Sequence, residues 1–252
     1  MGKRGQLTIL VIIALIIVAA VIVIMLYPRI SVLINPKVSP SSYLKSCIEP
    51  VVKSNIEILS KQGGYFAPQG NLDYKNQSIK YICYTAENYR TCLVQQPRIK
   101  GHFEDELNNA LAPKAEACAE NLKKEYEKRG YSVSLSEIHS NTSIVPGKIN
   151  IEFSMPMKIK KESTQTFSKF DIEVDSKIYD LLMISTSIID FESTYGDSET
   201  TLYMQYYPDL KIEKIKLSEG SRIYIVSDVV TKESFTFATR SMVWPPGYGF
   251  QQ

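Results

Sequence analysis

The sequence predicts an α+β protein with one N-terminal transmembrane helix, followed by an exported domain of helices and antiparallel sheet. Residues 7–27 form one apolar run in which only Thr8 is polar. Beyond this run, helical spacing of apolar residues and strand-like alternation occupy separate blocks, which is typical of α+β folds. With 252 residues and 44% apolar side chains, the chain is long enough to bury a sizeable core.

The apolar run is predicted to span a membrane. As a helix its 21 residues would cover about 31 Å, close to the thickness of the hydrocarbon layer. The run ends without the small-residue cleavage site of a secretory signal, so it should remain as an anchor in the lipid bilayer. Lys3 and Arg4 lie in a basic tail, residues 1–6, which is expected in the cytoplasm with the rest of the chain outside. The expected location is therefore the cell membrane, as a single-pass protein.

Three segments are expected after the anchor. Residues 28–40 contain Pro28, Pro36 and Pro40, and prolines favour an extended stalk. The remaining two segments are a helical, cysteine-containing subdomain over residues 41–130 and an antiparallel sheet with one helix over residues 131–252.

The first helix of the helical subdomain should begin at Ser41 or Ser42, because these side chains can cap it, and end at Gly63. Pro50 lies inside this pattern and should kink or divide the helix. The pattern further predicts strands over residues 79–84 and 90–95, and a second helix over 103–129 that is interrupted at Pro113 and ends at Gly130.

Strand-like alternation dominates from Tyr131 onward. Pro156 should mark an edge or a bulge, because proline cannot donate to a sheet. Helical spacing returns over residues 176–194, and the predicted strands cover residues 131–135, 149–153, 167–174, 209–217, 222–230 and 234–243.

Four cysteines suit two disulfides in an oxidising compartment. Three pairings are possible. Cys83 with Cys92 across a hairpin, and Cys47 with Cys118 between two helices, is the preferred one. Four reduced core thiols are the alternative. Two sequons make Asn76 and Asn141 candidates for glycosylation.

The residues that carry catalysis or metal binding do not form a recognisable motif. His102 and His139 are the only histidines and are far apart in the sequence, so no metal ligand set and no cofactor site is expected. Paired carboxylates such as Asp190 and Glu192, or Glu104 to Glu106, are interpreted as surface charges. Lys3, Arg4 and Arg29 account for three of the 29 basic residues, so the remaining 26 nearly balance the 27 acidic ones and predict no nucleic-acid partner.

Aromatic residues provide candidates for an interaction surface. Tyr203, Tyr206 and Tyr207 cluster before Pro208. The C-terminal tail adds the candidates Trp244, Tyr248 and Phe250. Aromatic side chains dominate the energetics of many interfaces, and an extended tail of this kind can dock in a groove of a partner. The alternative is that the tail covers the core of its own domain.

The string Lys3-Arg4-Gly5-Gln6 directly precedes the apolar run. This arrangement resembles the class III signal of archaeal type IV pilin-like proteins, and the resemblance implies peptidase cleavage between Gly5 and Gln6. The residue that is usually Glu in pilins is Leu10 here. The whole layout resembles uncharacterised single-anchor archaeal surface proteins, including the turn at residues 62–65 and the terminal strand at residues 235–240.

The sequence thus indicates a non-enzymatic, membrane-anchored extracytoplasmic protein with a structural or interaction role at the cell surface. Such a protein could form homo- or hetero-oligomers there. A type IV pilin-like subunit processed after Gly5 is one alternative. An exported hydrolase with a carboxylate site is another.

Overall fold

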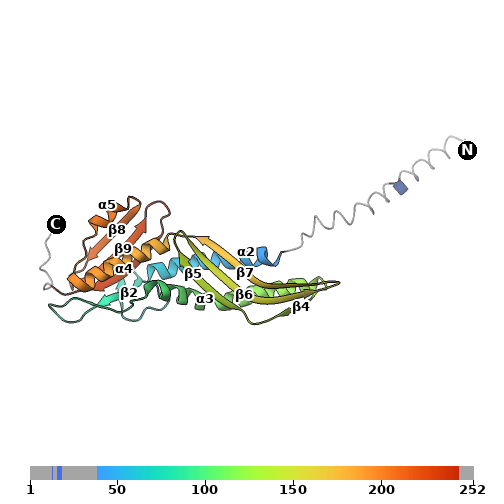
Figure 1. Cartoon of the computed structure of the whole chain (residues 1–252), viewed down its shortest axis with the longest axis horizontal. Coiled ribbons are helices and arrows are strands. Elements are labelled where there is room, and N and C mark those ends of the chain that lie inside the picture. Colours follow the sequence, from blue (N-terminus) through green and yellow to red (C-terminus); the bar gives the residue numbers. More distant parts are fainter. Residues whose placement is uncertain (1–12, 14–15, 19–38, 244–252) are drawn as a thin grey trace, which may run out of the picture. The chain divides into compact units, whose positions relative to one another are not determined.

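A computed structural model describes residue 13, residues 16–18 and residues 39–243 of the chain (Figure 1). Residues 44–243 lie in one compact unit. The structure has helices and two sheets, as an α+β protein should.

The transmembrane helix expected in the fold class is not found, and this part of the prediction is wrong. Among the residues that the structure describes, no helix combines the length and the apolar character needed to cross a membrane. Most of the run at residues 7–27, the tail at 1–6 and the stalk up to residue 38 lie outside the described residues.

Helix α2 (Pro40–Lys61) and helix α3 (Ile99–Lys128) each contain an internal proline, yet neither is divided. The expected interruption at Pro113 is wrong, and Pro50 does not split α2. A proline inside a helix costs about 3 kcal/mol. Burial of an apolar stripe along each helix offsets this cost. In α2 the stripe consists of Leu44, Ile48, Val52, Ile56 and Leu59.

The smaller sheet is built around one long strand, β6 (Lys148–Lys160). Along one edge β6 pairs with β7 (Thr164–Asp175), and along the other with β5 (His139–Val145) and then β4 (Ser132–Leu135), all antiparallel. The register with β7 shifts between Ser154 and Met157, so the bulge expected at Pro156 is confirmed. Strand β5 was not among the strands predicted from the sequence.

The larger sheet joins both halves of the chain. Its strand order is β1 (Asn71–Tyr74), β2 (Gln77–Tyr84), β10 (Ser234–Arg240), β9 (Ser221–Asp228) and β8 (Leu210–Lys216), with the short β3 (Leu93–Val94) also on β2. Because β2 and β10 are parallel, this sheet is mixed and not antiparallel throughout. Residues before and after 130 therefore share one sheet within one compact unit.

Helices cover the sheets and contact one another. Helix α3 contacts β4 and β5, whereas α4 (Ile178–Tyr195) contacts β9 and β10 as well as α3 (Figure 1). The Glu104 carboxylate of α3 accepts a 2.7 Å hydrogen bond from the Ile144 N–H of β5. A further short helix, α5 (Thr201–Tyr206), follows α4 and contacts β8. It was not predicted from the sequence.

The cysteines form the two pairs that the sequence favoured. Cys47 and Cys118 join α2 to α3, with their Cα atoms 6.2 Å apart. Cys83 and Cys92 join β2 to the segment before β3, with a Cα separation of 5.3 Å. All four cysteines are thus disulfide-bonded.

Removing each disulfide should have a different cost. The Cys47–Cys118 pair spans 71 residues, so replacing both cysteines by Ala should lower the free energy of unfolding by about 4 kcal/mol. The Cys83–Cys92 pair spans only 9 residues, and its removal should cost about 2.5 kcal/mol. Urea unfolding of both double variants measures these losses. Equal losses would contradict the loop-entropy argument.

Candidate functional site

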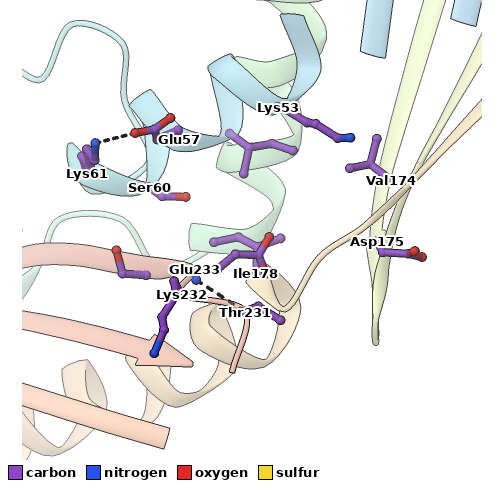
Figure 2. Close-up of a pocket in the computed structure, with 12 residues that line it drawn as sticks. Lys53, Glu57, Ser60, Lys61, Val174, Asp175, Ile178, Thr231, Lys232 and Glu233 are labelled. Carbon is purple, nitrogen blue, oxygen red and sulfur yellow. Dashed lines mark hydrogen bonds and ion pairs between the residues drawn. The ribbon is translucent and has the colours of Figure 1, made fainter. Parts of the chain in front are cut away.

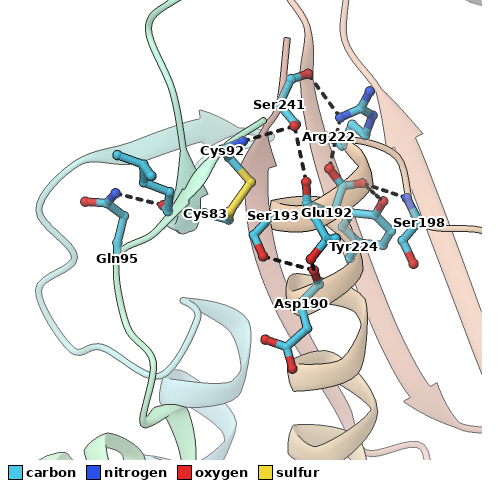
Figure 3. The surroundings of a disulfide bond; sticks show 12 residues. Cys83, Cys92, Gln95, Asp190, Glu192, Ser193, Ser198, Arg222, Tyr224 and Ser241 are labelled. Atoms are coloured by element: carbon cyan, nitrogen blue, oxygen red, sulfur yellow. Dashed lines mark hydrogen bonds and ion pairs between the residues drawn. A yellow bond between two sulfur atoms is a disulfide. The ribbon is translucent and has the colours of Figure 1, made fainter. Parts of the chain in front are cut away.

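The carboxylate of Glu192 is fully buried at the C-terminal end of α4 (Figure 3). Its Oε1 accepts hydrogen bonds from the Tyr224 hydroxyl and, at 3.1 Å, from the Ser198 N–H. Its Oε2 lies 3.0 Å from a guanidinium nitrogen of the largely buried Arg222. A buried carboxylate is costly without partners, and here both oxygens have donors.

Further charged side chains surround Arg222 on the side of Asp197. The Asp197 carboxylate lies 3.6 Å from Arg222 Nε and pairs with Lys214, while Lys216 is 3.3 Å away. Burial raises the pKa of Asp197, but the hydrogen bond and charge of Lys214, with the other cations, outweigh it and hold the pKa below its ordinary value. We call Glu192, Asp197, Lys214, Arg222 and Tyr224 the buried network.

Tyr224 acts as a hydrogen-bond donor in the buried network. Burial raises the pKa of its phenol above the ordinary value, and the negative charge of Glu192 raises it further. The phenol therefore remains protonated and gives its proton to the hydrogen bond with Glu192.

Ser241 links the buried network to the Cys83–Cys92 disulfide (Figure 3). Its hydroxyl accepts a 3.1 Å hydrogen bond from the Cys92 N–H and donates at 3.3 Å to the Glu192 carbonyl. Its carbonyl accepts a 3.3 Å hydrogen bond from Arg222. The end of α4, strand β9 and the disulfide loop are thus fixed to one another.

An aromatic pocket opens beside Phe191 of α4. Its volume is about 470 Å³, within the range of ligand pockets. Phe191, the residue before Glu192, is 40% exposed, and Tyr206 on α5 is 80% exposed. We call this site the aromatic pocket, and it is lined by Phe191, Glu199, Leu202, Tyr203, Tyr206 and Tyr207.

The position of α5, which forms one wall of the aromatic pocket, depends on two side-chain contacts. The Tyr203 hydroxyl lies 2.7 Å from the Ser187 hydroxyl of α4. The sulfur of Met204 accepts a 3.3 Å hydrogen bond from the Ile212 N–H of β8. The loop that leads into α5 carries Asp197 and Ser198, so the buried network also holds the start of this wall.

A second pocket, of about 340 Å³, shares Tyr207 with the aromatic pocket. Three carboxylates and one cation line it, together with the apolar side chains of Met183 and Ile184. We call it the acidic pocket, after Asp180, Asp209 and Asp228, which outnumber Lys177.

A third pocket, of about 460 Å³, lies between α2, the end of β7 and the loop between β9 and β10 (Figure 2). Most of its charged side chains have a partner within the protein. Lys61 pairs with Glu57 at 2.6 Å, Lys232 donates to the Val229 carbonyl at 2.6 Å, and Glu233 accepts from the Lys177 N–H.

The candidates from the sequence differ in their placement. Tyr203, Tyr206 and Tyr207 all line the aromatic pocket. Asn76, in the turn between β1 and β2, and Asn141, on β5, are exposed. Outside the described residues lie Gly5, Gln6, Trp244, Tyr248 and Phe250.

The interpretation of the paired carboxylates as surface charges is wrong for several of them. Glu192 is buried, Glu104 binds β5, and Glu106 accepts a 3.1 Å hydrogen bond from the Phe66 N–H. The sequence also missed Phe191 and Leu202. The helical spacing of α4 already placed Glu192 and Ile188 on one face, a signal that this carboxylate faces the core.

The histidines remain separate from each other. His102 lies in the first turn of α3, where its ring is 3.9 Å from that of Tyr65, and burial lowers its pKa. His139 lies exposed on β5. Within the described part of the chain, no three His, Cys, Asp or Glu side chains are grouped as they would be to hold a metal ion.

Comparison with known proteins finds no family model, no curated protein and no solved structure that matches this chain.

Replacing Glu192 by Leu should lower the free energy of unfolding by about 3–5 kcal/mol, because Arg222 would be left buried without its main partner. The matched control is Asp190→Leu, since Asp190 lies exposed on the same helix and should change stability by no more than about 0.5 kcal/mol. Urea unfolding compares them. A similar, small loss of unfolding free energy in both variants would show that the Glu192–Arg222 pair contributes little to stability.

Acid should destabilise the protein partly through Asp197. Because its folded-state pKa is lowered from the ordinary 3.8, its contribution is present above that value and is lost as the pH falls through the lower, folded-state pKa. The free energy of unfolding of the wild type should therefore fall more steeply below about pH 4 than that of Asp197→Asn. Denaturant titrations from pH 6 to pH 2 test this, and parallel curves would refute it.

Proposed function

We propose that this chain is a disulfide-bonded, extracytoplasmic interaction protein without enzymatic activity. It acts at the cell surface by binding another protein through the aromatic pocket. The observation that carries the proposal is this pocket, in which exposed aromatic side chains lie on α4 and on α5, which is hydrogen-bonded to α4 and β8.

The exposure of these side chains supports a contact role. Leu202 and Tyr207 are each 56% exposed, beside the even more exposed Tyr206. Grouped apolar exposure of this kind is unfavourable in water and is typical of protein interfaces. Tyrosines are among the side chains that contribute most to binding energy.

The acidic pocket indicates the chemistry of the partner. Hydrogen bonds to Thr231 lower the pKa of Asp228, and hydrogen bonds to Thr201 lower the pKa of Glu199 in the aromatic pocket, so both are ionised at neutral pH. A partner segment with an apolar or aromatic anchor next to Lys or Arg side chains would complement the two adjoining pockets.

Two further features favour binding outside the cytoplasm over catalysis. Paired cysteines suit an oxidising compartment. Glu192, whose carboxylate has three partners, has no exposed surface and therefore cannot reach a substrate.

Site-specific photo-cross-linking in the native cells tests the proposal. A photoreactive residue in place of Tyr206 should form one defined cross-linked product, whereas one in place of Tyr89, which is 72% exposed but distant in sequence from the pocket, should not. Adding Leu202→Asp should remove the product, because a charge in the pocket opposes an apolar anchor. Equal cross-linking from both positions, or a product that survives Leu202→Asp, would contradict the proposal.

A further inference from the structure

The described part of the chain ends beside the C-terminal end of α4, the helix that carries Phe191 of the aromatic pocket. Gly196 caps α4 in a left-handed conformation, with φ of 87°. A Cβ atom added to Gly196 would collide with the side chain of Val243, so Val243 lies directly against the end of α4. The hydrogen bonds of Ser241 to the Glu192 carbonyl and to Cys92 fix this position.

The nine residues after Val243 are long enough to reach the pocket. Fully extended, residues 244–252 span about 30 Å. Phe191, on the wall of the pocket, precedes Gly196 by five residues, which is about 7.5 Å along the helix axis. Even a partly folded segment can therefore cover this distance.

The composition of this segment matches the pocket. The sequence Trp-Pro-Pro-Gly-Tyr-Gly-Phe-Gln-Gln contains three aromatic residues and two prolines, and it has no charged side chain. Grooves lined by aromatic residues bind proline-containing segments, because the stiff chain loses little entropy on docking. Aromatic pairs add attraction beyond the area that they bury.

We propose that the C-terminal segment of this chain, residues 244–252, docks into the aromatic pocket of the same molecule, with Trp244 as its anchor. Having no basic residue, the segment leaves the acidic pocket open. A partner that binds both pockets would then displace the segment. This inference goes beyond the proposed function and is independent of it. A partner could bind the pocket without the tail covering it, and the tail could cover the pocket without a partner binding there.

Trp244 is the only tryptophan of the chain, so its fluorescence reports on this segment alone. In the full-length protein its emission should be blue-shifted and weakly quenched by acrylamide. The variants Leu202→Ser and Tyr206→Ser should shift the emission to that of an exposed indole. Val230→Ser removes an exposed apolar side chain from the loop between β9 and β10, away from the C-terminal end of α4, and should leave the emission unchanged.

Several results would overturn the inference. One is an emission typical of an exposed indole in the wild type. Another is a blue-shifted emission that stays the same in both Leu202→Ser and Tyr206→Ser. The emission should also be independent of protein concentration. A shift that grows with concentration would place the segment in a second copy of the chain and not in its own pocket.

A second measurement does not depend on pocket variants. A chain that ends at Val243 should bind a synthetic peptide of residues 244–252, with a blue shift of the peptide's Trp emission on titration. The same peptide with Trp244→Ala, followed by calorimetry, should bind at least tenfold more weakly. No binding of the first peptide, or equal binding of both, would contradict the inference. Because this readout needs no cellular partner, its failure leaves the cross-linking test of the proposed function intact.

Discussion

A carboxylate buried at the end of α4 constrains the residues around it. Glu192 has no contact with water, so its charge must be balanced within the protein. Arg222 supplies the balancing charge, while Tyr224 and the Ser198 N–H supply the remaining donors. These groups come from α4, β9 and the loop before α5, so satisfying one carboxylate positions three parts of the fold.

The aromatic pocket follows from this arrangement. Phe191 and Glu192 are neighbours on α4, about 100° apart around the helix axis, and they reach different sites. Phe191 lines the aromatic pocket, whereas Glu192 belongs to the buried network. A helix as short as α5 is not stable by itself in water. Its anchoring loop and the contacts of Tyr203 and Met204 therefore keep its exposed tyrosines in place. The exposed site thus depends on a buried, fully partnered one.

Much of the secondary structure and one part of the site could be predicted from the sequence. Local patterns found most helices and strands, and the tyrosines at 203, 206 and 207 stood out by their clustering. Two kinds of feature were missed. The prolines in α2 and α3 are tolerated because tertiary packing outweighs a local penalty. The parallel pairing of β2 with β10 joins residues about 150 positions apart, which no local pattern shows.

The buried network was missed for a related reason. A glutamate is almost always at the surface unless it is paired, and its partner Arg222 lies 30 residues away in the sequence. Burial of Glu192 is energetically tolerated only because β9 packs against α4 and brings Arg222 and Tyr224 to its carboxylate. The membrane helix of the expected fold class rested on composition alone, without any tertiary information.

The most direct test of the link between the buried network and the aromatic pocket is amide hydrogen exchange in Glu192→Gln. This change removes the charge and keeps the size of the side chain. The account predicts faster exchange in residues 197–207, which include the loop and α5, while β6 in the other sheet keeps its wild-type rate. Asp190→Asn should change neither region. Unchanged exchange in residues 197–207 of Glu192→Gln would show that the pocket does not depend on the buried carboxylate.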